Sequence, residues 1–348
     1  MWDEAVLVNW HAGEPLVVGV RRFAAMLDLF RDLPARTAFH HSVQTNGTLI
    51  DSAFAELFRQ HDVSVGVSID GPEHINDAVR VKRNGAGSFH GIMRGIQKLR
   101  DSGAQFTTLS VVSERSIDRI EEILVFLRGI GSSSVAFNMD EREGVNAHSS
   151  LDHLSYGEAC AFWRRLIAAA SSMQLTVREI DRALCAIYFP HNTLPNPNVK
   201  LGSFITVGAA GSVTSFSPEL FGQESETYAK FEFGNIWRNT LPELLSVSAA
   251  LDLEQAIRRG TDRCQRECEY FGLCGGGWPS NKFSEHGRFD VAETRMCRFM
   301  VKALVDSVLE LGSDRAISSY FRSRMIALVR GTVAPQDQSE STCMNMPI

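Results

Sequence analysis

The feature that most constrains this chain is a group of cysteines in its last third. Cys264, Cys268 and Cys274 lie within eleven residues, and Cys297 follows after one short segment. Three successive glycines, Gly275–Gly277, allow the backbone to bend behind these thiols. Four cysteine thiolates are a ligand set of both zinc sites and iron–sulfur clusters. We therefore expect these four residues to hold a metal centre, and the spacing leaves zinc and iron–sulfur as alternatives.

The cysteines fit two non-metal roles less well. Buried, unreactive cysteines are common in proteins, but they are rarely this dense. A disulfide framework is typical of short secreted chains, whereas this sequence has 348 residues, seven cysteines and no pattern of a signal peptide. An odd number of cysteines fits a reducing compartment, so we expect a cytoplasmic protein.

The composition excludes some classes of partner. A hydrophobic fraction of 44% and a charged fraction of 22% are ordinary for a globular protein of one large or two moderate domains. A net charge of −6 provides no basic surface, so we expect no nucleic-acid partner. No apolar run approaches the ~20 residues of a membrane span, so we expect no membrane. The polar tail Val333–Ile348 is expected to be disordered and leaves Cys343 without an assigned role.

Strands and helices alternate between Ala5 and Met139. The expected strands are Ala5–Trp10, Ala38–Val43, Val63–Ile69, Phe106–Val112 and Val135–Met139. The expected helices are Val20–Leu33, Ser52–His61, Ser88–Ser102 and Ile117–Gly129. Such alternation predicts βαβ units, an α/β fold and a parallel sheet with both faces covered.

Polar and glycine-rich residues follow each of these strands. The segments are His11–Pro15, Gln44–Gly47, Ser68–Pro72, Ser113–Glu114 and Asn138–Glu141. Each alone is also an ordinary turn or helix start. Because the carboxyl ends of parallel strands share one rim, where α/β folds bind ligands, five such segments together predict a ligand pocket there.

After Gly144 the pattern changes. Expected helices are Tyr156–Met173, Arg178–Phe189, Leu241–Ser248, Ala249–Arg259, Cys297–Leu311 and Arg315–Val329, and a hairpin is expected from Ser203–Val207 and Val213–Phe216. We divide the chain into residues 1–145, a helical connection at 146–200, a cysteine-rich domain at 201–312, and a final helix with the disordered tail at 313–348.

Several motifs together resemble one enzyme family. They are HAGEP (His11–Pro15), QTNGTLID (Gln44–Asp51), VSIDGP (Val67–Pro72), FGNI (Phe233–Ile236) and the cysteine segment. From His11 to about Leu311 the chain resembles radical S-adenosylmethionine (SAM) enzymes with a C-terminal SPASM domain. The segments CEYFGLCGGGWPSNK, AFNMDEREGVN and SPEL are most similar to those of the cyclophane-forming maturases of glycine-rich repeat precursor peptides. The resemblance implies a partial (β/α)6 radical SAM barrel followed by an α+β SPASM-like iron–sulfur domain.

The resemblance also implies roles for residues on the rim. Glu14 would bind the methionyl ammonium of SAM, which suits a carboxylate acceptor, and Gly13 would let the backbone approach closely. Ser68 and Asp70 would contact the methionyl carboxylate or the ribose. The remaining candidates on the rim are Asn46 and Ser113, and Asp140 and Glu141 either face the peptide or form a solvated acidic loop.

The resemblance is incomplete in the metal sites. SPASM domains bind two auxiliary [4Fe–4S] clusters, but here Gly202, Phe216 and Trp278 stand where cysteines of one set are usual. The other set is complete as Cys264, Cys268, Cys274 and Cys297, although its first spacing is CX3C in place of the commoner CX2C. We therefore expect one auxiliary cluster.

The cluster that activates SAM needs a CX3CX2C motif after the first barrel strand, and no cysteines here have that spacing. The chain begins in what resembles the second strand of the barrel. We expect that the first strand, its loop and its helix are missing through a late gene start, a degenerate gene or a split gene. SAM and a second [4Fe–4S] cluster are expected only if that segment is present.

Three functions follow as hypotheses. The first is modification of a ribosomally made precursor peptide by a radical SAM enzyme that joins an aromatic side chain to a β-carbon and uses an external electron donor. The first alternative is a sulfatase-maturating enzyme, which generates formylglycine. The second alternative is a non-catalytic peptide-binding fragment with a four-cysteine metal site.

Overall fold

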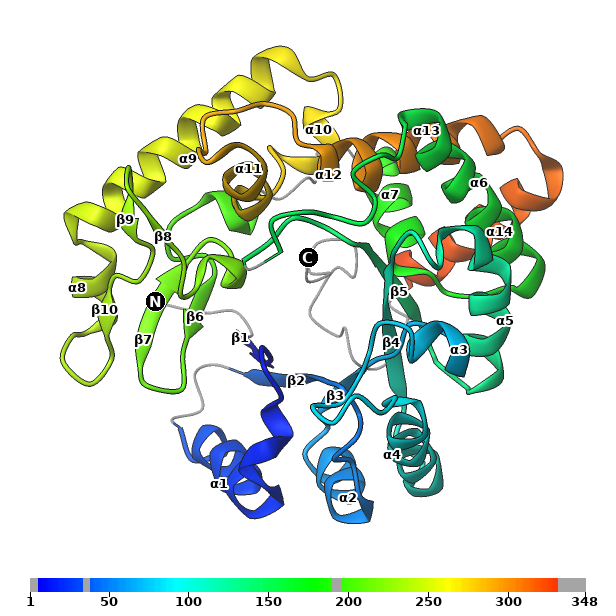
Figure 1. Cartoon of the computed structure of the whole chain (residues 1–348), viewed down its shortest axis with the longest axis horizontal. Coiled ribbons are helices and arrows are strands. Elements are labelled where there is room, and N and C mark those ends of the chain that lie inside the picture. Colours follow the sequence, from blue (N-terminus) through cyan, green and yellow to red (C-terminus); the bar gives the residue numbers. More distant parts are fainter. Residues whose placement is uncertain (1–5, 34–37, 145, 190–195, 331–348) are drawn as a thin grey trace. The chain divides into compact units, whose positions relative to one another are not determined.

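The computed structural model describes residues 6–33, 38–144, 146–189 and 196–330 (Figure 1). The chain forms two compact units. The first contains Met1–Asn138, Phe162–Arg182 and Leu311–Ile348, and the second contains Met139–Ala161 and Ala183–Glu310. Each unit is therefore built from separated stretches, whereas the sequence suggests four consecutive segments. The expected disordered tail and Cys343 lie outside the described residues.

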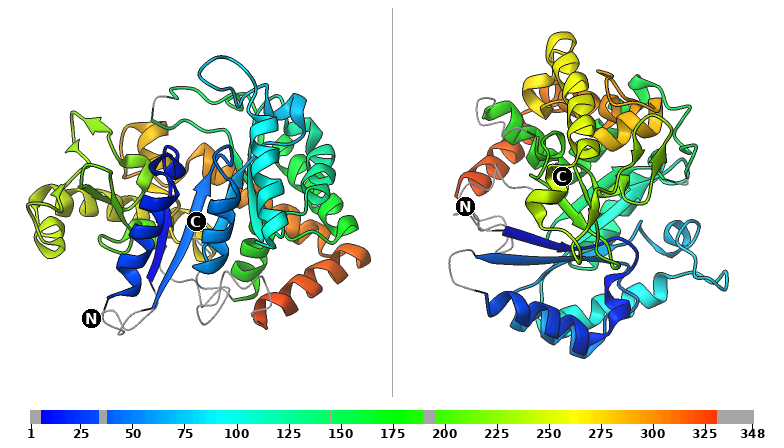
Figure 2. Two further views of the ribbon diagram at one scale, coloured as in Figure 1. Left: turned by 90° about the horizontal axis from the view of Figure 1, so that it is seen from below. Right: turned by 90° about the vertical axis from the view of Figure 1, so that its left-hand side faces the viewer.

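The first unit is organised around a parallel sheet that curls as part of a barrel (Figures 1 and 2). Its strands follow the chain order: β1 (Val6–Trp10), β2 (Phe39–Thr45), β3 (Ser64–Ser68), β4 (Phe106–Val112) and β5 (Val135–Met139). Alternate residues of β4, from Phe106 to Val112, are buried, as expected for a strand with a packed face. The five predicted strands are confirmed, and β4 and β5 have the predicted ends.

The helices of the first unit include α1 (Val20–Arg31), α2 (Ser52–Gln60), α3 (Glu73–Asn76), α4 (Phe89–Ser102), α5 (Ile120–Gly129) and α14 (Arg315–Val329), with 3-10 turns at Pro15–Val18 and Ile117–Arg119. Helix α2 begins at Ser52 because the Asp51 carboxylate accepts a hydrogen bond from Phe54 N at 2.9 Å. Helix α4 packs closely on the loop after β2: a Cβ at Gly95 would lie 2.1 Å from the Gly47 carbonyl oxygen. Glycine at this point therefore fixes the position of the Asn46–Gly47 turn.

Two helices contribute to both units, α6 (Tyr156–Met173) and α7 (Arg178–Tyr188). The second unit also contains the predicted hairpin, β6 (Ile205–Val207) and β7 (Ser212–Ser215). β7 pairs antiparallel with β10 (Gly234–Asn235), and a separate ribbon joins β8 (Glu224–Ser225) to β9 (Ala229–Lys230). The core of this unit contains the rings of Phe216, Phe231 and Phe289.

The remaining elements of the second unit carry the cysteines. They are α8 (Leu241–Leu245), α9 (Ser248–Glu267), α10 (Phe271–Cys274), α11 (Pro279–His286), α12 (Arg295–Cys297), a π-helical turn at Arg298–Lys302 and α13 (Ala303–Leu311), with 3-10 turns at Pro197–Val199 and Pro218–Leu220. The expectation that a helix ends at Arg259 is wrong, because α9 continues to Glu267 and carries Cys264 in its last turn. Among the described residues, no helix combines the length and apolarity needed to cross a membrane.

Candidate functional site

Glu14 lies on the rim at the carboxyl ends of β1 and β2. Ala12 and Gly13 both have left-handed backbone angles, with φ of 68° and 60°, and this turn directs Glu14 toward β2. Glu14 Oε1 accepts hydrogen bonds from Thr45 Oγ1 at 2.7 Å and Leu16 N at 3.1 Å, and Oε2 accepts one from Asn46 N at 2.8 Å. A carboxylate has about four acceptor positions. One position therefore remains for a donor such as an ammonium group.

Asn46 and Ser68 lie in the first unit at the ends of β2 and β3, and Asn46 N contacts the Glu14 carboxylate. Asn46 Oδ1 accepts bonds from the backbone and hydroxyl of Thr48, at 2.9 and 2.6 Å, which closes a local turn. Ser68 Oγ accepts a bond from Gln44 Nε2 at 2.9 Å. Their predicted contacts with SAM stay predictions, and both side chains also order the rim.

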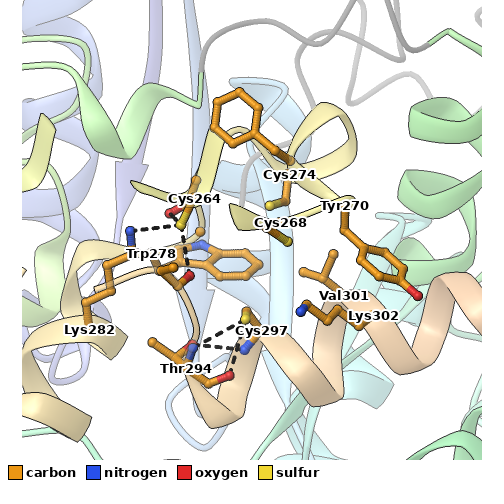
Figure 3. A pocket seen from close by; sticks show the side chains of 14 residues that line it. Cys264, Cys268, Tyr270, Cys274, Trp278, Lys282, Thr294, Cys297, Val301 and Lys302 are labelled. Carbon is orange, nitrogen blue, oxygen red and sulfur yellow. Dashed lines mark hydrogen bonds between the residues drawn. The ribbon is translucent and has the colours of Figure 1, made fainter. Parts of the chain in front are cut away.

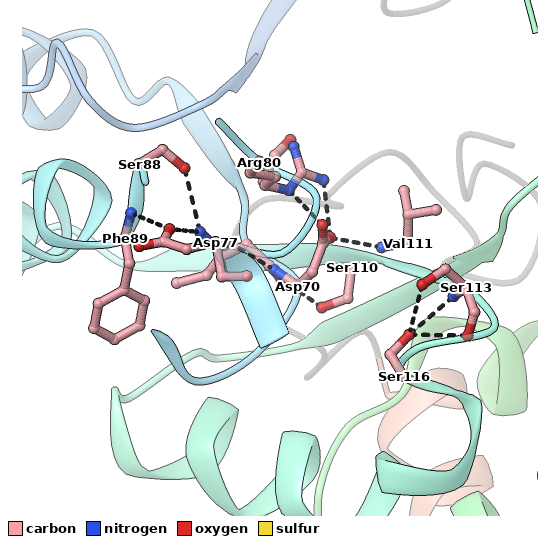
Figure 4. Close-up of polar contacts among 12 residues, drawn as sticks. Asp70, Asp77, Arg80, Ser88, Phe89, Ser110, Val111, Ser113 and Ser116 are labelled. Carbon is pink, nitrogen blue, oxygen red and sulfur yellow. Dashed lines mark hydrogen bonds and ion pairs between the residues drawn. The ribbon is translucent and has the colours of Figure 1, made fainter. Parts of the chain in front are cut away.

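Asp70 has internal partners for its carboxylate (Figure 4). It is 2% exposed, and it accepts bonds from Arg80 Nε at 2.7 Å, Arg80 Nη2 at 2.9 Å and Val111 N at 2.8 Å. These bonds tie the loop after β3 to β4. The structure therefore gives Asp70 a positioning role. A direct contact with SAM stays a prediction.

Ser113 begins the turn after β4. Its backbone N–H donates to Ser116 Oγ at 2.8 Å (Figure 4). Its carbonyl accepts a hydrogen bond from Ile117 N at 2.9 Å. The structure thus brings the predicted rim residues to successive strand ends, with Glu14 and Asn46 in direct contact. Sequence reasoning missed Thr45, although it lies inside the QTNG motif, and it missed Arg80, for which no sequence signal exists.

The four candidate cysteines of the second unit line one pocket (Figure 3). Cys264 comes from the end of α9, Cys268 caps that helix, Cys274 ends α10 and Cys297 ends α12. Trp278, Tyr270, Lys282 and Lys302 also line this pocket. Its cavity of about 20 Å³ holds roughly one water, so a cluster bound there must displace side chains outward. Among the described residues, no three His, Cys, Asp or Glu side chains are arranged to hold a single metal ion.

The donor set nevertheless fits a metal centre. Burial raises the pKa values of the Cys264, Cys274 and Cys297 thiols, the last to about 11. Opposing contacts favour the thiolates: Lys282 beside Cys264, the backbone N–H groups of Gly276 and Gly277 at Cys274, and Thr294 N at 3.4 Å from Cys297 Sγ. Buried thiols of this kind are inert alone, and a bound cation reverses the balance by holding them as thiolates.

The loop after β5 is partly buried and not simply a solvated acidic loop. Asp140 Oδ2 accepts a bond from Ser150 N at 2.7 Å, and Glu141 Oε2 accepts one from Asn281 Nδ2. Desolvation and the neighbouring Glu143 raise the pKa of Glu141 to about 8. Within the second unit, Asp140 and Glu141 line a cavity of about 210 Å³ together with Arg142, Ser149, Asp152, Glu285, His286, Arg295, Met296 and Phe299.

The raised pKa of Glu141 predicts how stability depends on pH. The folded protein binds more protons than the unfolded chain between pH 4.5 and about 8, so the free energy of unfolding falls as pH rises through this window. We expect Glu141→Gln to remove part of that fall, on the order of 2 kcal/mol, in urea unfolding at pH 5 and pH 8. The exposed Glu226→Gln should keep the wild-type profile. Parallel profiles for E141Q and wild type would contradict this prediction.

Known proteins resemble this chain over most of its length. Residues 2–127 match the model of the Radical SAM superfamily. The uncharacterized protein sll1766 of Synechocystis sp. is 33% identical over 311 residues, which cover 86% of this chain and 77% of that relative. A serine-type anaerobic sulfatase-maturating enzyme of Bacteroides thetaiotaomicron is 23% identical over 311 residues, covering 84% of this chain and 73% of the enzyme.

A solved structure shares the fold. Native anSMEcpe with bound AdoMet and Cp18Cys peptide superimposes with a TM-score of 0.72 and 21% identity, covering 92% of this chain and 86% of that chain. At this identity the likeness concerns the fold alone. It extends beyond the parallel sheet, because the 92% coverage includes most of the second unit.

Proposed function

Because this chain belongs to the radical SAM superfamily, we propose that it modifies a peptide or protein substrate in the manner of the sulfatase-maturating enzymes. The observation that carries this proposal is the similarity to a serine-type sulfatase-maturating enzyme over 84% of the chain. The similarity to this enzyme therefore extends beyond residues 2–127, which match the superfamily model. The sulfatase-maturating alternative therefore takes precedence over crosslinking.

The rim of the first unit supports a SAM site. Glu14 has three hydrogen bonds that fix its carboxylate and one acceptor position left for the methionyl ammonium. Gly13 carries no side chain over that position, and Asn46, Ser68 and Ser113 offer polar groups along the same rim. When bound to its own [4Fe–4S] cluster, SAM supplies a carbon radical that removes hydrogen from a substrate. The cysteines of this sequence include no CX3CX2C ligands for that cluster.

The cysteine pocket supports one auxiliary [4Fe–4S] cluster within a SPASM-like domain. Zinc ligands share one ion, whereas the cysteines of a cluster bind different irons and stand further apart. Four thiols that line one pocket supply the complete ligand set of one [4Fe–4S] cluster. A cluster held by Cys264, Cys268, Cys274 and Cys297 would supply one-electron redox chemistry, and an external donor would supply the electron that SAM requires.

Crosslinking of an aromatic side chain remains the second candidate, and one observation favours it. Phe216, where the resemblance places a ligand of a second auxiliary cluster, is fully buried in the core against Phe231 and Phe289. Gly202 and Trp278 likewise have no sulfur to offer at the other positions of that set. The missing ligand set of a second auxiliary cluster speaks against the sulfatase-maturating type and therefore favours crosslinking.

The product distinguishes these functions. Protein expressed anaerobically from the complete gene would be incubated with SAM, a reductant and peptides that contain serine or cysteine, and with glycine-rich peptides encoded beside the gene. An aldehyde trapped by a hydrazide supports sulfatase-type maturation. A product that has lost two hydrogens, fails to react with hydrazide and resists fragmentation supports crosslinking. If no peptide changes while SAM is cleaved, or if peptides bind without change, the proposed function is wrong.

A further inference from the structure

Lys282 is a buried lysine at the cysteine pocket of the second unit (Figure 3). It is 3% exposed, although lysine is rarely buried without a partner of opposite charge. Helix α11 begins at Pro279, and the Lys282 backbone N–H donates to the Trp278 carbonyl at 3.2 Å. The first turn of α11 therefore holds the side chain against Cys264, where Lys282 Nζ lies 3.3 Å from Cys264 Sγ.

The ammonium group of Lys282 has no carboxylate within ion-pair distance among the described residues, and its side-chain hydrogen-bond partner there is Cys264 Sγ. Lys302 lines the same pocket but differs, because its ammonium pairs with Glu293 Oε2 at 2.5 Å and its side chain is 20% exposed. A buried charge without a counter-charge is strongly unfavourable. A neutral thiol does not supply that counter-charge, whereas a metal-bound thiolate does.

We propose that Lys282 is the charge partner of the auxiliary cluster and raises its reduction potential. This inference rests on the proposed function, since it requires a cluster on Cys264, Cys268, Cys274 and Cys297. One-electron reduction adds one negative charge to the cluster and its thiolates. A cation 3.3 Å from a ligand sulfur, in a buried and weakly screened place, stabilises that reduced form more than the oxidised form.

The test compares four proteins after anaerobic reconstitution with iron and sulfide: wild type, Lys282→Met, Lys282→Arg and Lys302→Met. EPR-monitored redox titration gives the midpoint potential of each. We expect K282M to be more negative by at least about 59 mV, a tenfold change in the ratio of oxidised to reduced cluster for one electron. K282R keeps the charge and K302M removes a charge already paired, so both should change that ratio less than about threefold.

Separate outcomes test the two levels of this proposal. If the wild type binds no iron and sulfide, the cluster assignment is wrong and the role of Lys282 is overturned with it. If the cluster forms but K282M keeps the wild-type potential or matches K302M, only the Lys282 role is overturned. Should K282M lose the cluster, Lys282→Gln, which donates without a charge, replaces it in the titration. If both uncharged variants lose the cluster while K282R keeps it, the result supports the need for a cation at this position. If K282R loses the cluster as well, the result contradicts that need.

Discussion

Replacing Cys264 with alanine is expected to remove the metal centre. We expect anaerobically purified C264A to hold at most about a tenth of the iron and sulfide of the wild type, because a lost ligand weakens binding more than the 10–100-fold typical of an outer contact. The brown absorbance should fall in proportion. Iron and sulfide analysis with visible absorption spectroscopy checks this result.

The control for Cys264 is Cys160→Ala. Cys160 is also a buried cysteine of the second unit, but it lies in α6 and does not line the cysteine pocket. Its replacement should leave the iron and sulfide content at the wild-type level. Full iron content in C264A, or equal losses in both variants, would show that Cys264 is not a ligand.

The second large effect concerns the rim of the first unit. Arg80→Met removes the cation that pairs with the Asp70 carboxylate, which is only 2% exposed. The remaining hydrogen bond from Val111 N does not compensate the buried charge. Breaking a buried pair from one side typically costs about 3–5 kcal/mol. Because Arg80 itself is 27% exposed, we expect the lower end of this range: R80M should have a free energy of unfolding about 3 kcal/mol below that of the wild type, measured by urea unfolding.

Arg59→Met is the matched control for Arg80. Arg59 also forms a bidentate pair with a carboxylate, that of Glu56, but both side chains are exposed on α2. Its removal should leave the unfolding midpoint unchanged, because water replaces the lost contact. If R80M is no less stable than R59M, the Asp70–Arg80 pair does not hold the rim together.

The sequence predicts those elements whose pattern is set by burial alone. Strand β4, helix α6 and helix α14 have the predicted ends because their apolar residues recur with the period of a strand or a helix. The end of α9 is missed. Gly260 remains inside the helix, where a Cβ would lie 2.0 Å from the Phe289 carbonyl oxygen, so this glycine permits close packing and does not end the helix.

The same contrast holds in the site. Glu14 and Asn46 could be placed on one rim because both follow strands of a parallel sheet. The Asp70–Arg80 pair could not, since Arg80 lies in an irregular loop ten residues away. The four cysteines are close enough in sequence to predict a shared pocket. The burial of Lys282 depends on how α11 packs beside them, and the sequence around this lysine does not indicate that it is buried.

The most direct test of the central claim is the iron, zinc and acid-labile sulfide content of the wild-type chain, purified and reconstituted anaerobically. One auxiliary [4Fe–4S] cluster on Cys264, Cys268, Cys274 and Cys297 predicts about four irons and four sulfides per chain, a brown colour and an EPR signal after reduction. A colourless protein that binds about one zinc and no sulfide would contradict the claim.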